Sequence, residues 1–297
     1  MSNGMERILI AGCGYVGSRV AELLSSKGIE VWSLNRKLKN LPSQIKQLTG
    51  DVTDFSSLPR MNMKFDTVVY AVSPQERTKE AYRSTYYHGL EHVMRKLNQS
   101  RDPGGPIRLI LVSSTGIFSQ NQGEWVSEET DPEPVSETSR QLLEAECLAN
   151  NLGDPGIVIR LAGIYGPGRT RMIRNLINGR VDCPENQHYT NRIHRDDCAG
   201  SICHLINLSN PKSLYIGADN NPTPLDVIYS WIANKTGRKD PCESTTSDLV
   251  ADRKPIKTNK RCSNQRLVES GYTFQYPSYR EGYTPLIQKE LANLRHA

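Results

Sequence analysis

A glycine-rich turn near the N-terminus constrains the fold of this chain more than any other feature. It follows the apolar run 7–11 and opens a segment whose apolar residues recur at helical spacing. Its six residues are Gly12-Cys13-Gly14-Tyr15-Val16-Gly17. Between a strand and a helix, such glycines permit a tight turn, let a pyrophosphate approach the backbone and allow close helix–strand packing. The helix N-terminus then presents free N–H groups to phosphate, so the pattern predicts a dinucleotide-binding turn.

The rest of the first half alternates short apolar runs with helical patterns, which is typical of consecutive βαβ units. We expect strands at 7–11, 30–34, 67–71, 108–113 and 156–161, and helices at about 16–28, 81–97 and 141–150. The second half is less regular and richer in loops. The sequence therefore predicts an α/β protein with a Rossmann doubly wound parallel sheet and a smaller C-terminal substrate lobe.

The expected division of the chain follows from this change of pattern. Residues 5–165 should form the dinucleotide-binding domain, which also receives 194–217. Residues 166–297 should form the smaller substrate-binding lobe, partly interleaved with that domain. A chain of 297 residues is long enough for a large domain with a smaller lobe.

The end of the second expected strand bears on the choice of dinucleotide. NAD-specific sites usually place an Asp or Glu there to bind the ribose 2′-hydroxyl, whereas an Arg accommodates a 2′-phosphate. This chain has Asn35 and Arg36 there, followed by Lys37 and Lys39. Asn35 does not repel a phosphate, and Arg36 can pair with it or stack on adenine. The pattern favours NADP over NAD, with a solvated basic loop as the alternative.

The composition indicates a globular protein and argues against several partners. Apolar residues make up 37% of the sequence and charged residues 23%, with both signs interspersed. The net charge of +5 has no sharp focus, which disfavours nucleic acid, although an RNA-associated protein on the same fold remains a reading of the basic loops. No apolar stretch approaches the ~20 residues of a membrane span, and the N-terminus shows no signal-peptide pattern. We expect a cytoplasmic protein that binds no membrane, with a cleaved transit peptide left open.

The seven cysteines do not group at the spacing of metal ligands. They stand at positions 13, 147, 183, 198, 203, 242 and 262, with no Cys-x-x-Cys pair and no Cys/His cluster. The pattern predicts no metal site, and reduced thiols as in a cytosol-like compartment.

Four further motifs, in order along the chain, carry a resemblance to a known family. They are Gly50-Asp51-Val52-Thr53-Asp54, the segment 111–118 with Ser113-Ser114-Thr115-Gly116, the segment 160–168 with Tyr165-Gly166-Pro167-Gly168, and the segment 193–199 with His194-Arg195-Asp196-Asp197. With the glycine-rich turn, they make the chain similar to the extended short-chain dehydrogenase/reductases of the nucleotide-sugar epimerase/dehydratase type. The resemblance implies a bound NAD(P), with Asp51 and Val52 at the adenine. We also expect Ala71 and Val72, at the end of the strand 67–71, to line the cofactor site.

The chain departs from this family at the catalytic helix. Family oxidoreductases use a Tyr-x-x-x-Lys pair, in which the lysine lowers the pKa of the phenol and the tyrosine exchanges a proton with the substrate. The segment 136–144 aligns with that helix but places Ser136 at the tyrosine and Arg140 at the lysine. A serine hydroxyl is far less acidic than a phenol, so the usual proton transfer is not available. The chain thus resembles the atypical extended subgroup, which keeps the cofactor fold but lacks the pair.

Three residues are candidates for the catalytic site. Ser114 occupies the position of the family's helper hydroxyl, and Arg140 can still supply positive charge. Tyr165 follows a strand end that faces the cleft where such sheets bind ligands. The alternative for Tyr165 is structural: it and His194 would hold loops together by hydrogen bonds.

Two functions follow from these residues. The first is an NADP-dependent oxidoreductase or epimerase-like enzyme with an unusual proton donor, acting on a small or nucleotide-linked substrate. Arg169, Arg171 and Arg192 suit an anionic ligand of that kind, although a charged surface explains them almost equally well. The second is a catalytically silent dinucleotide-binding regulator or scaffold. The sequence does not indicate the oligomeric state.

Overall fold

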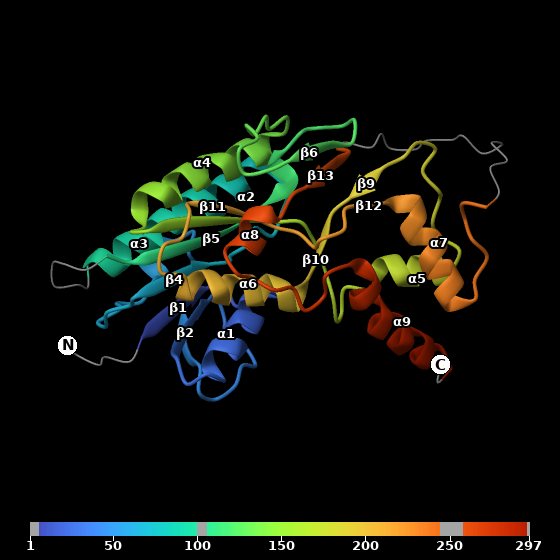
Figure 1. Ribbon diagram of the computed structural model, residues 1–297. Coiled ribbons are helices and arrows are strands. Elements are labelled where there is room, and N and C mark those ends of the chain that lie inside the picture. The colour runs from blue at the N-terminus through green and yellow to red at the C-terminus, as the bar shows by residue number, and fades with distance from the viewer. Residues whose placement is uncertain (1–5, 100–105, 244–257, 296–297) are drawn as a thin grey trace.

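A seven-stranded sheet lies at the centre of the computed structural model, which describes residues 6–99, 106–243 and 258–295 (Figure 1). In spatial order its strands are β11 (Leu214–Gly217), β7 (Gly156–Leu161), β5 (Arg108–Ser114), β4 (Thr67–Tyr70), β1 (Arg7–Ala11), β2 (Glu30–Asn35) and β3 (Lys46–Thr49). Every neighbouring pair is parallel. The predicted α/β class and its parallel sheet are therefore confirmed.

Helices cover both faces of this sheet. They are α1 (Gly17–Ser25) and α6 (Arg195–Asn207) on one face, and α3 (Gly89–Gln99) and α4 (Glu137–Leu152) on the other. Within β1, Ile8 and Ile10 belong to the apolar cluster on the face covered by α1 and α6, whereas Leu9 and Ala11 belong to the cluster on the face covered by α3 and α4. All four side chains are fully buried, because strands of a parallel sheet are covered on both faces. This double covering explains the continuous apolar runs in the sequence.

The strand order places a crevice near the middle of the sheet. From β1 the chain moves outward through β2 to β3, then returns to the other side of β1 and continues through β4, β5 and β7 to β11. The winding reverses between β1 and β4, and open α/β sheets bind ligands outside the carboxyl ends of their strands at such a point. The glycine-rich turn begins at Gly12, directly after β1, so it lies at this crevice.

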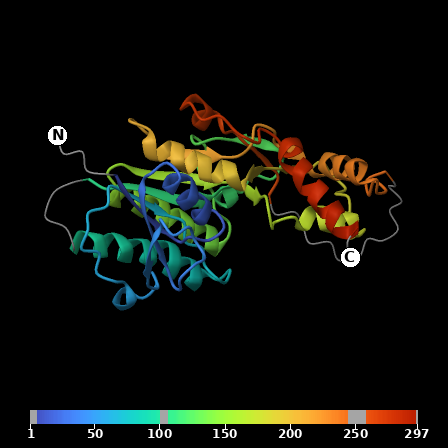
Figure 2. The ribbon, with the colours of Figure 1, turned by 90° about the horizontal axis from the view of Figure 1, so that it is seen from below.

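A smaller group of helices lies beside the sheet (Figures 1 and 2). It comprises α5 (Arg171–Ile177), α7 (Leu225–Thr236) and α9 (Tyr279–Arg295), which share one apolar cluster. Two strand pairs border it, β8 (Gly163–Tyr165) with β10 (Arg192–His194) and β9 (Tyr189–Thr190) with β12 (Thr223–Pro224). The chain enters this group after β8, returns through β10 to α6 and β11, and then leaves the sheet again. Residues 195–217 thus lie with the sheet, between two segments that form the smaller group.

The remaining elements connect these layers. They are α2 (Lys79–Tyr82), the π-helical turn η2 (Arg83–His88), the 3₁₀ turns η1 (Phe55–Ser57) and η3 (Thr115–Ile117), the parallel pair β6 (Glu124–Val126) and β13 (Lys260–Cys262), and α8 (Gln265–Glu269). No helix in the described ranges combines the length and the apolar character that crossing a membrane requires. The same ranges contain no group of three or more His, Cys, Asp or Glu arranged to hold a metal ion.

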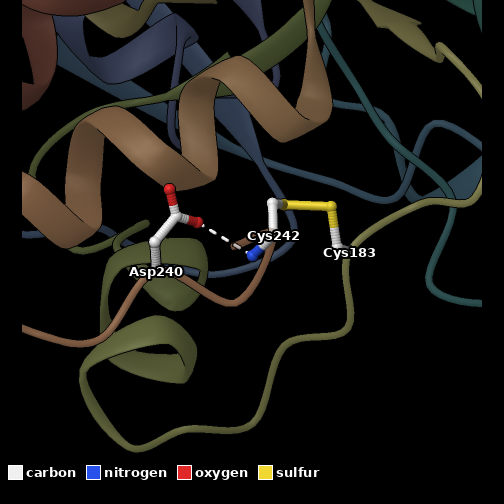
Figure 3. Close-up of a disulfide and its surroundings, with 3 residues drawn as sticks. All are labelled: Cys183, Asp240 and Cys242. Carbon is white, nitrogen blue, oxygen red and sulfur yellow. Dashed lines mark hydrogen bonds between the residues drawn. A yellow bond between two sulfur atoms is a disulfide. The ribbon is translucent and has the colours of Figure 1, made fainter. Parts of the chain in front are cut away.

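The prediction that all the cysteines are reduced is wrong for one pair. Cys183 and Cys242 form a disulfide, with their Cα atoms 5.1 Å apart (Figure 3). Cys183 lies in the loop after α5 and Cys242 in the loop after α7. The backbone N–H of Cys242 donates a hydrogen bond to the carboxylate of Asp240. Because α5 and α7 pack together, the fold joins two cysteines 59 residues apart, which their spacing in the sequence does not reveal. The other five cysteines are free thiols.

Candidate cofactor site and adjoining cavity

A cavity of about 930 Å³ opens at the crevice beyond β1, β2 and β4. The sequence predicts eleven cofactor-binding residues, and ten of them line this cavity: Gly12, Gly14, Tyr15, Val16, Asn35, Arg36, Asp51, Val52, Ala71 and Val72. Gly17 instead begins α1 and is buried. The volume lies in the range that proteins form for cofactors and drug-sized ligands, about 300–1,000 Å³. The fold thus brings four separate loops to one cavity, and cofactor binding by these residues stays a prediction.

The three glycines of the turn have different surroundings. Gly12 has a φ of +92°, and a Cβ there would lie 2.7 Å from the backbone of Ala71 and Val72. A Cβ on Gly17 would overlap the carbonyl oxygen of Gly12. Gly14, by contrast, has nothing within 4 Å of the place that its Cβ would take. The turn is therefore packed tightly on one side and open to the cavity at Gly14, which is the space that a pyrophosphate needs.

The N-terminus of α1 is free to interact with an anion. No side chain caps this helix, and its first turn carries no acidic residue. The partial positive charge of a helix N-terminus stabilises phosphate when no protein carboxylate competes for it. The residues present therefore fit the diphosphate part of a dinucleotide.

Asn35, at the end of β2, holds the glycine-rich turn in place. Its side chain is 9% exposed, and its Oδ1 accepts a hydrogen bond from the backbone N–H of Cys13 at 2.8 Å. Its Nδ2 is buried and has no hydrogen-bond partner among the described residues. Buried polar groups normally find a partner, so the unpaired Nδ2 is an exception in a residue that lines the cavity.

Basic residues gather where the cavity extends past β2. Arg36, Lys37 and Lys39 all line it there. When the amide of Gln75 is turned so that its oxygen faces Arg36, that oxygen accepts hydrogen bonds from Nη1 at 2.9 Å and Nη2 at 2.6 Å. This neutral contact orients the guanidinium without cancelling its charge. The arrangement can bind a phosphate group at this end of the cavity.

The loop after β8 reaches back to the glycine-rich turn. The hydroxyl of Tyr15 donates a hydrogen bond to the carbonyl of Pro167 at 2.9 Å, and the guanidinium of Arg169 lies 4.1 Å from the centre of the Tyr15 ring. Arg169 also lines the cavity, together with Val112 and Ile164 from β5 and β8. The far end of the cavity therefore lies where the sheet meets the smaller group of helices.

The structure does not bring the three catalytic candidates together. The Oγ of Ser114 accepts a hydrogen bond from the N–H of Gly116 at 3.1 Å and lines a second cavity, described below. Arg140 is exposed and forms an ion pair with Glu137 one turn earlier in α4. Ser136 caps the same helix, since its Oγ accepts a hydrogen bond from the N–H of Ser139 at 3.1 Å. Neither Ser136 nor Arg140 lines either of the two cavities.

Tyr165 lies inside the smaller apolar cluster rather than in a cavity wall. It is 4% exposed, and its hydroxyl is buried without a hydrogen-bond partner among the described residues. Its ring centre lies 4.6 Å from that of Tyr283 and 5.3 Å from that of His194. Burial raises the pKa of the Tyr165 phenol well above its ordinary value. A catalytic role for Tyr165 stays a prediction, and its surroundings are those of a packing residue.

A second cavity, of about 290 Å³, adjoins the carboxyl ends of β5 and β7. Ser114 and Gly163 line its sheet side, while His188, Asn191 and Lys260 come from segments near the smaller group of helices. The ammonium of Lys260 donates a hydrogen bond to the carbonyl of Phe118 at 3.0 Å, and burial lowers its pKa below the usual lysine value. Burial also lowers the pKa of His188, and the nearby cations Arg192 and Lys260 lower it further.

Sequence reasoning did not single out Lys260, which stands within a basic stretch of the C-terminal third. In β13, Lys260 and Cys262 are buried, whereas the Arg261 side chain lies 4.8 Å from the Tyr189 ring centre and 5.1 Å from that of Trp125. A Lys-Arg-Cys tripeptide does not indicate which cation points inward. The only available signal was the alternation of a strand, and a strand of three residues is too short to carry it.

Comparisons with known proteins agree with this fold. The NAD dependent epimerase/dehydratase family matches residues 8–192. Protein YeeZ of Escherichia coli (strain K12) is 26% identical over 284 residues, which cover 92% of this chain and 97% of that protein. A solved structure from Methylobacillus flagellatus, assigned to the NAD-dependent epimerase/dehydratases, is 33% identical with a TM-score of 0.78 and covers 98% of this chain and 100% of its own.

A further solved structure shares the fold at lower identity. MoeE5, in complex with UDP-glucuronic acid and NAD, is 20% identical with a TM-score of 0.74, and the match covers 97% of this chain and 99% of that one. The resemblance inferred from the sequence motifs is confirmed, because the family match extends over more than half of the chain. The chain belongs to the NAD dependent epimerase/dehydratase family.

Proposed function

We propose that this protein binds NADP(H) in the 930 Å³ cavity and catalyses hydride transfer on a small polar substrate held in the adjoining 290 Å³ cavity. The observation that carries the choice of NADP is the group Arg36, Lys37 and Lys39 at the end of β2. No carboxylate stands between residues 35 and 39, where an NAD-specific site would place one. Asn35 already bonds the turn, which leaves the 2′ position of the ribose to the basic residues.

Different residues of the larger cavity bind different parts of the dinucleotide. The open side of the turn at Gly14 and the N-terminus of α1 receive the diphosphate, and Arg36 pairs with the 2′-phosphate. Bound NADP(H) supplies or accepts the hydride. Ser114, at the end of β5, presents its hydroxyl to the smaller cavity, where it can hydrogen-bond a substrate oxygen. Positioning of this kind can lower a reaction barrier even without a strong acid.

The preference for NADP is tested by titrating NADP and NAD into the wild-type protein and Arg36→Ala. Wild type should bind NADP more tightly. The variant should lose roughly 10- to 100-fold in NADP affinity, because charge-assisted hydrogen bonds contribute about 1.5–3 kcal/mol, and should change little toward NAD. Arg60→Ala is the matched control, since Arg60 is exposed and does not line the cavity. Equal affinities of wild type for the two dinucleotides would remove this part of the proposal.

A second function is favoured by one specific observation. Ser136 is used as a helix cap, Arg140 is paired on the surface, and Tyr165 is buried away from both cavities. A protein that binds the dinucleotide as a regulator or scaffold would need none of these groups for chemistry. This reading expects tight NADP(H) binding without any oxidation or reduction of the nicotinamide, followed at 340 nm, across panels of small carbonyl compounds and nucleotide sugars.

A further inference from the structure

The polar side chains that line the smaller cavity in the described ranges are neutral or basic. Its lining residues include the hydroxyl-bearing Ser114 and Thr190, together with Asn191, His188 and Lys260. No carboxylate is among its lining residues in the described ranges. Its volume of about 290 Å³ is at the lower limit of ligand pockets, which suits a compact molecule better than a nucleotide sugar.

Lys260 is held in this cavity by its backbone. The side chain of Asn191 pairs with β13 like a neighbouring strand: its Nδ2 donates to the carbonyl of Lys260 at 2.9 Å, and its Oδ1 accepts from the N–H of Cys262 at 2.7 Å. The adjacent Asn259 accepts a hydrogen bond from the N–H of Tyr189 at 2.8 Å. These contacts hold the backbone around Lys260 in place. The strand therefore cannot rotate so as to turn the Lys260 side chain away from the cavity.

The charge of Lys260 has no counterion in the described structure. The side chain is 5% exposed, and its Nζ donates to the carbonyl of Phe118 at 3.0 Å. No carboxylate of the described residues lies within ion-pair distance. A buried ammonium is costly unless it is paired, and one carbonyl satisfies only one of its three N–H groups.

A second buried cation adds to the positive potential. Arg192 is 4% exposed; one terminal nitrogen donates to the Oγ1 of Thr190 at 2.8 Å, and the other has no partner among the described residues. Asp219 is buried next to Arg192. Burial raises the pKa of the Asp219 carboxyl and the charge of Arg192 lowers it by less, although the two side chains form no ion pair. His188 lies near both Lys260 and Arg192, and its Nδ1 is buried without a partner. Of these three basic residues, Lys260 and His188 line the cavity, whereas Arg192 does not line it and acts on it through the charge felt by His188.

We propose that this cavity binds the carboxylate of a small organic acid substrate, with the ammonium of Lys260 as its ion-pair partner and the side chains of Ser114 and Asn191 as hydrogen-bond donors. The inference deepens the proposed function, on which it rests, by naming the substrate class. A carboxylate balances the single ammonium of the lining, whereas a phosphate dianion would need a second cation in the wall. The carbonyl or hydroxyl carbon that exchanges hydride lies on the remainder of the substrate, toward the larger cavity.

The test measures binding of matched neutral and charged probes to the full-length protein. Acetate, propanoate, butanoate and benzoate are compared with their primary amides at constant ionic strength, with inorganic phosphate as a further probe. At least one carboxylate should bind about tenfold or more tightly than its amide. The proposal is overturned if no carboxylate binds better than its amide, or if phosphate binds better than every carboxylate.

A variant of Lys260 tests whether the preference for carboxylates over amides depends on this ammonium. Lys260→Met should weaken carboxylate binding roughly 10- to 100-fold and leave amide and NADP(H) binding unchanged, whereas the exposed-site control Lys212→Met should behave as wild type. Unchanged carboxylate affinity in a folded Lys260→Met protein would also overturn the proposal. The carboxylate–amide comparison uses wild type alone, so it holds even if the variant does not fold. Running each titration with and without NADP(H) separates a failure of this inference from a failure of the cofactor proposal.

Discussion

At the scale of single residues, the glycines of the turn make different demands, and substitutions at Gly14 and Gly17 should separate binding from stability. Gly14→Val meets open space and has no left-handed φ, so the fold should survive, but the new side chain occupies the place of the pyrophosphate. Thermal stabilisation by NADP(H), present in wild type, should vanish in this variant. Gly17→Ala, whose Cβ would overlap the carbonyl of Gly12, should instead lower the melting temperature without ligand. A Gly14→Val protein that keeps the wild-type shift would identify the turn as purely structural.

Residues also differ in how far the sequence could identify them. Gly12 and Gly14 were predictable, because a strand–turn–helix pattern calls for a tight turn at the first glycine and for space beside the backbone at the second. The side chain of Asn35 was expected at the ribose, yet it bonds the backbone of Cys13. Lys260 was not singled out at all, because its importance comes from burial without a counterion, and burial is decided by segments far away in the sequence.

At the scale of helices, the first turn of α4 tests whether Ser136 is a cap or an acid. Its backbone is extended and its Oγ accepts from the N–H of Ser139. Ser136→Ala should lower the free energy of unfolding by about 1 kcal/mol, within 0.5–2, because one N–H of the helix end loses its acceptor. NADP(H) binding, and turnover on any substrate that is found, should not change. Ser136→Asp should retain stability, since aspartate caps equally well; a large loss of turnover in Ser136→Ala alone would give Ser136 a catalytic role.

The elements themselves were predicted unevenly, for a physical reason. The five strands expected in the first half coincide with β1, β2, β4, β5 and β7 to within one residue at each end, because doubly covered strands read as apolar runs. Helix α4 begins earlier than expected, at Glu137, since its cap and not its apolar stripe sets the start. The helix expected at 81–97 is interrupted by the π-helical turn η2, which local patterns do not reveal. Short elements such as β9 and β12 owe their existence to their pairing across the fold.

At the scale of the whole molecule, two cavities share the line where the sheet meets the smaller group of helices. The larger is built from loops that follow β1 to β4, so the βαβ pattern was enough to expect it. The smaller draws on the end of β5, the start of β8, the segment 188–191 and the segment 258–260, which meet only after the chain has twice left the sheet. Cofactor residues were therefore predictable from consecutive motifs, whereas the substrate cavity required the assembled fold.

The same boundary should make the stability of the molecule depend on pH through Asp219, where the chain leaves β11 for β12. Asp219 is 1% exposed, its backbone N–H donates to the carbonyl of Arg192, and one of its carboxylate oxygens has no partner among the described residues. Burial raises its pKa to about 7, from a model-peptide value near 4. Because the folded-state pKa is the higher one, the folded protein retains this proton while the unfolded chain has released it.

Asp219 therefore contributes stability below about pH 4 that is lost as the pH rises toward 7. Asp219→Asn cannot ionise and keeps the oxygen that accepts from the N–H of Asn221. The free energy of unfolding of this variant, minus that of wild type, should rise by up to roughly 4 kcal/mol between pH 4 and pH 8, as measured by urea denaturation. Asp182→Asn, at an exposed carboxyl of the smaller group of helices, is the matched control. If the difference in unfolding free energy between Asp219→Asn and wild type does not change with pH, the Asp219 carboxylate is solvated or paired in the folded protein. The positive potential around Arg192 would then be correspondingly weaker.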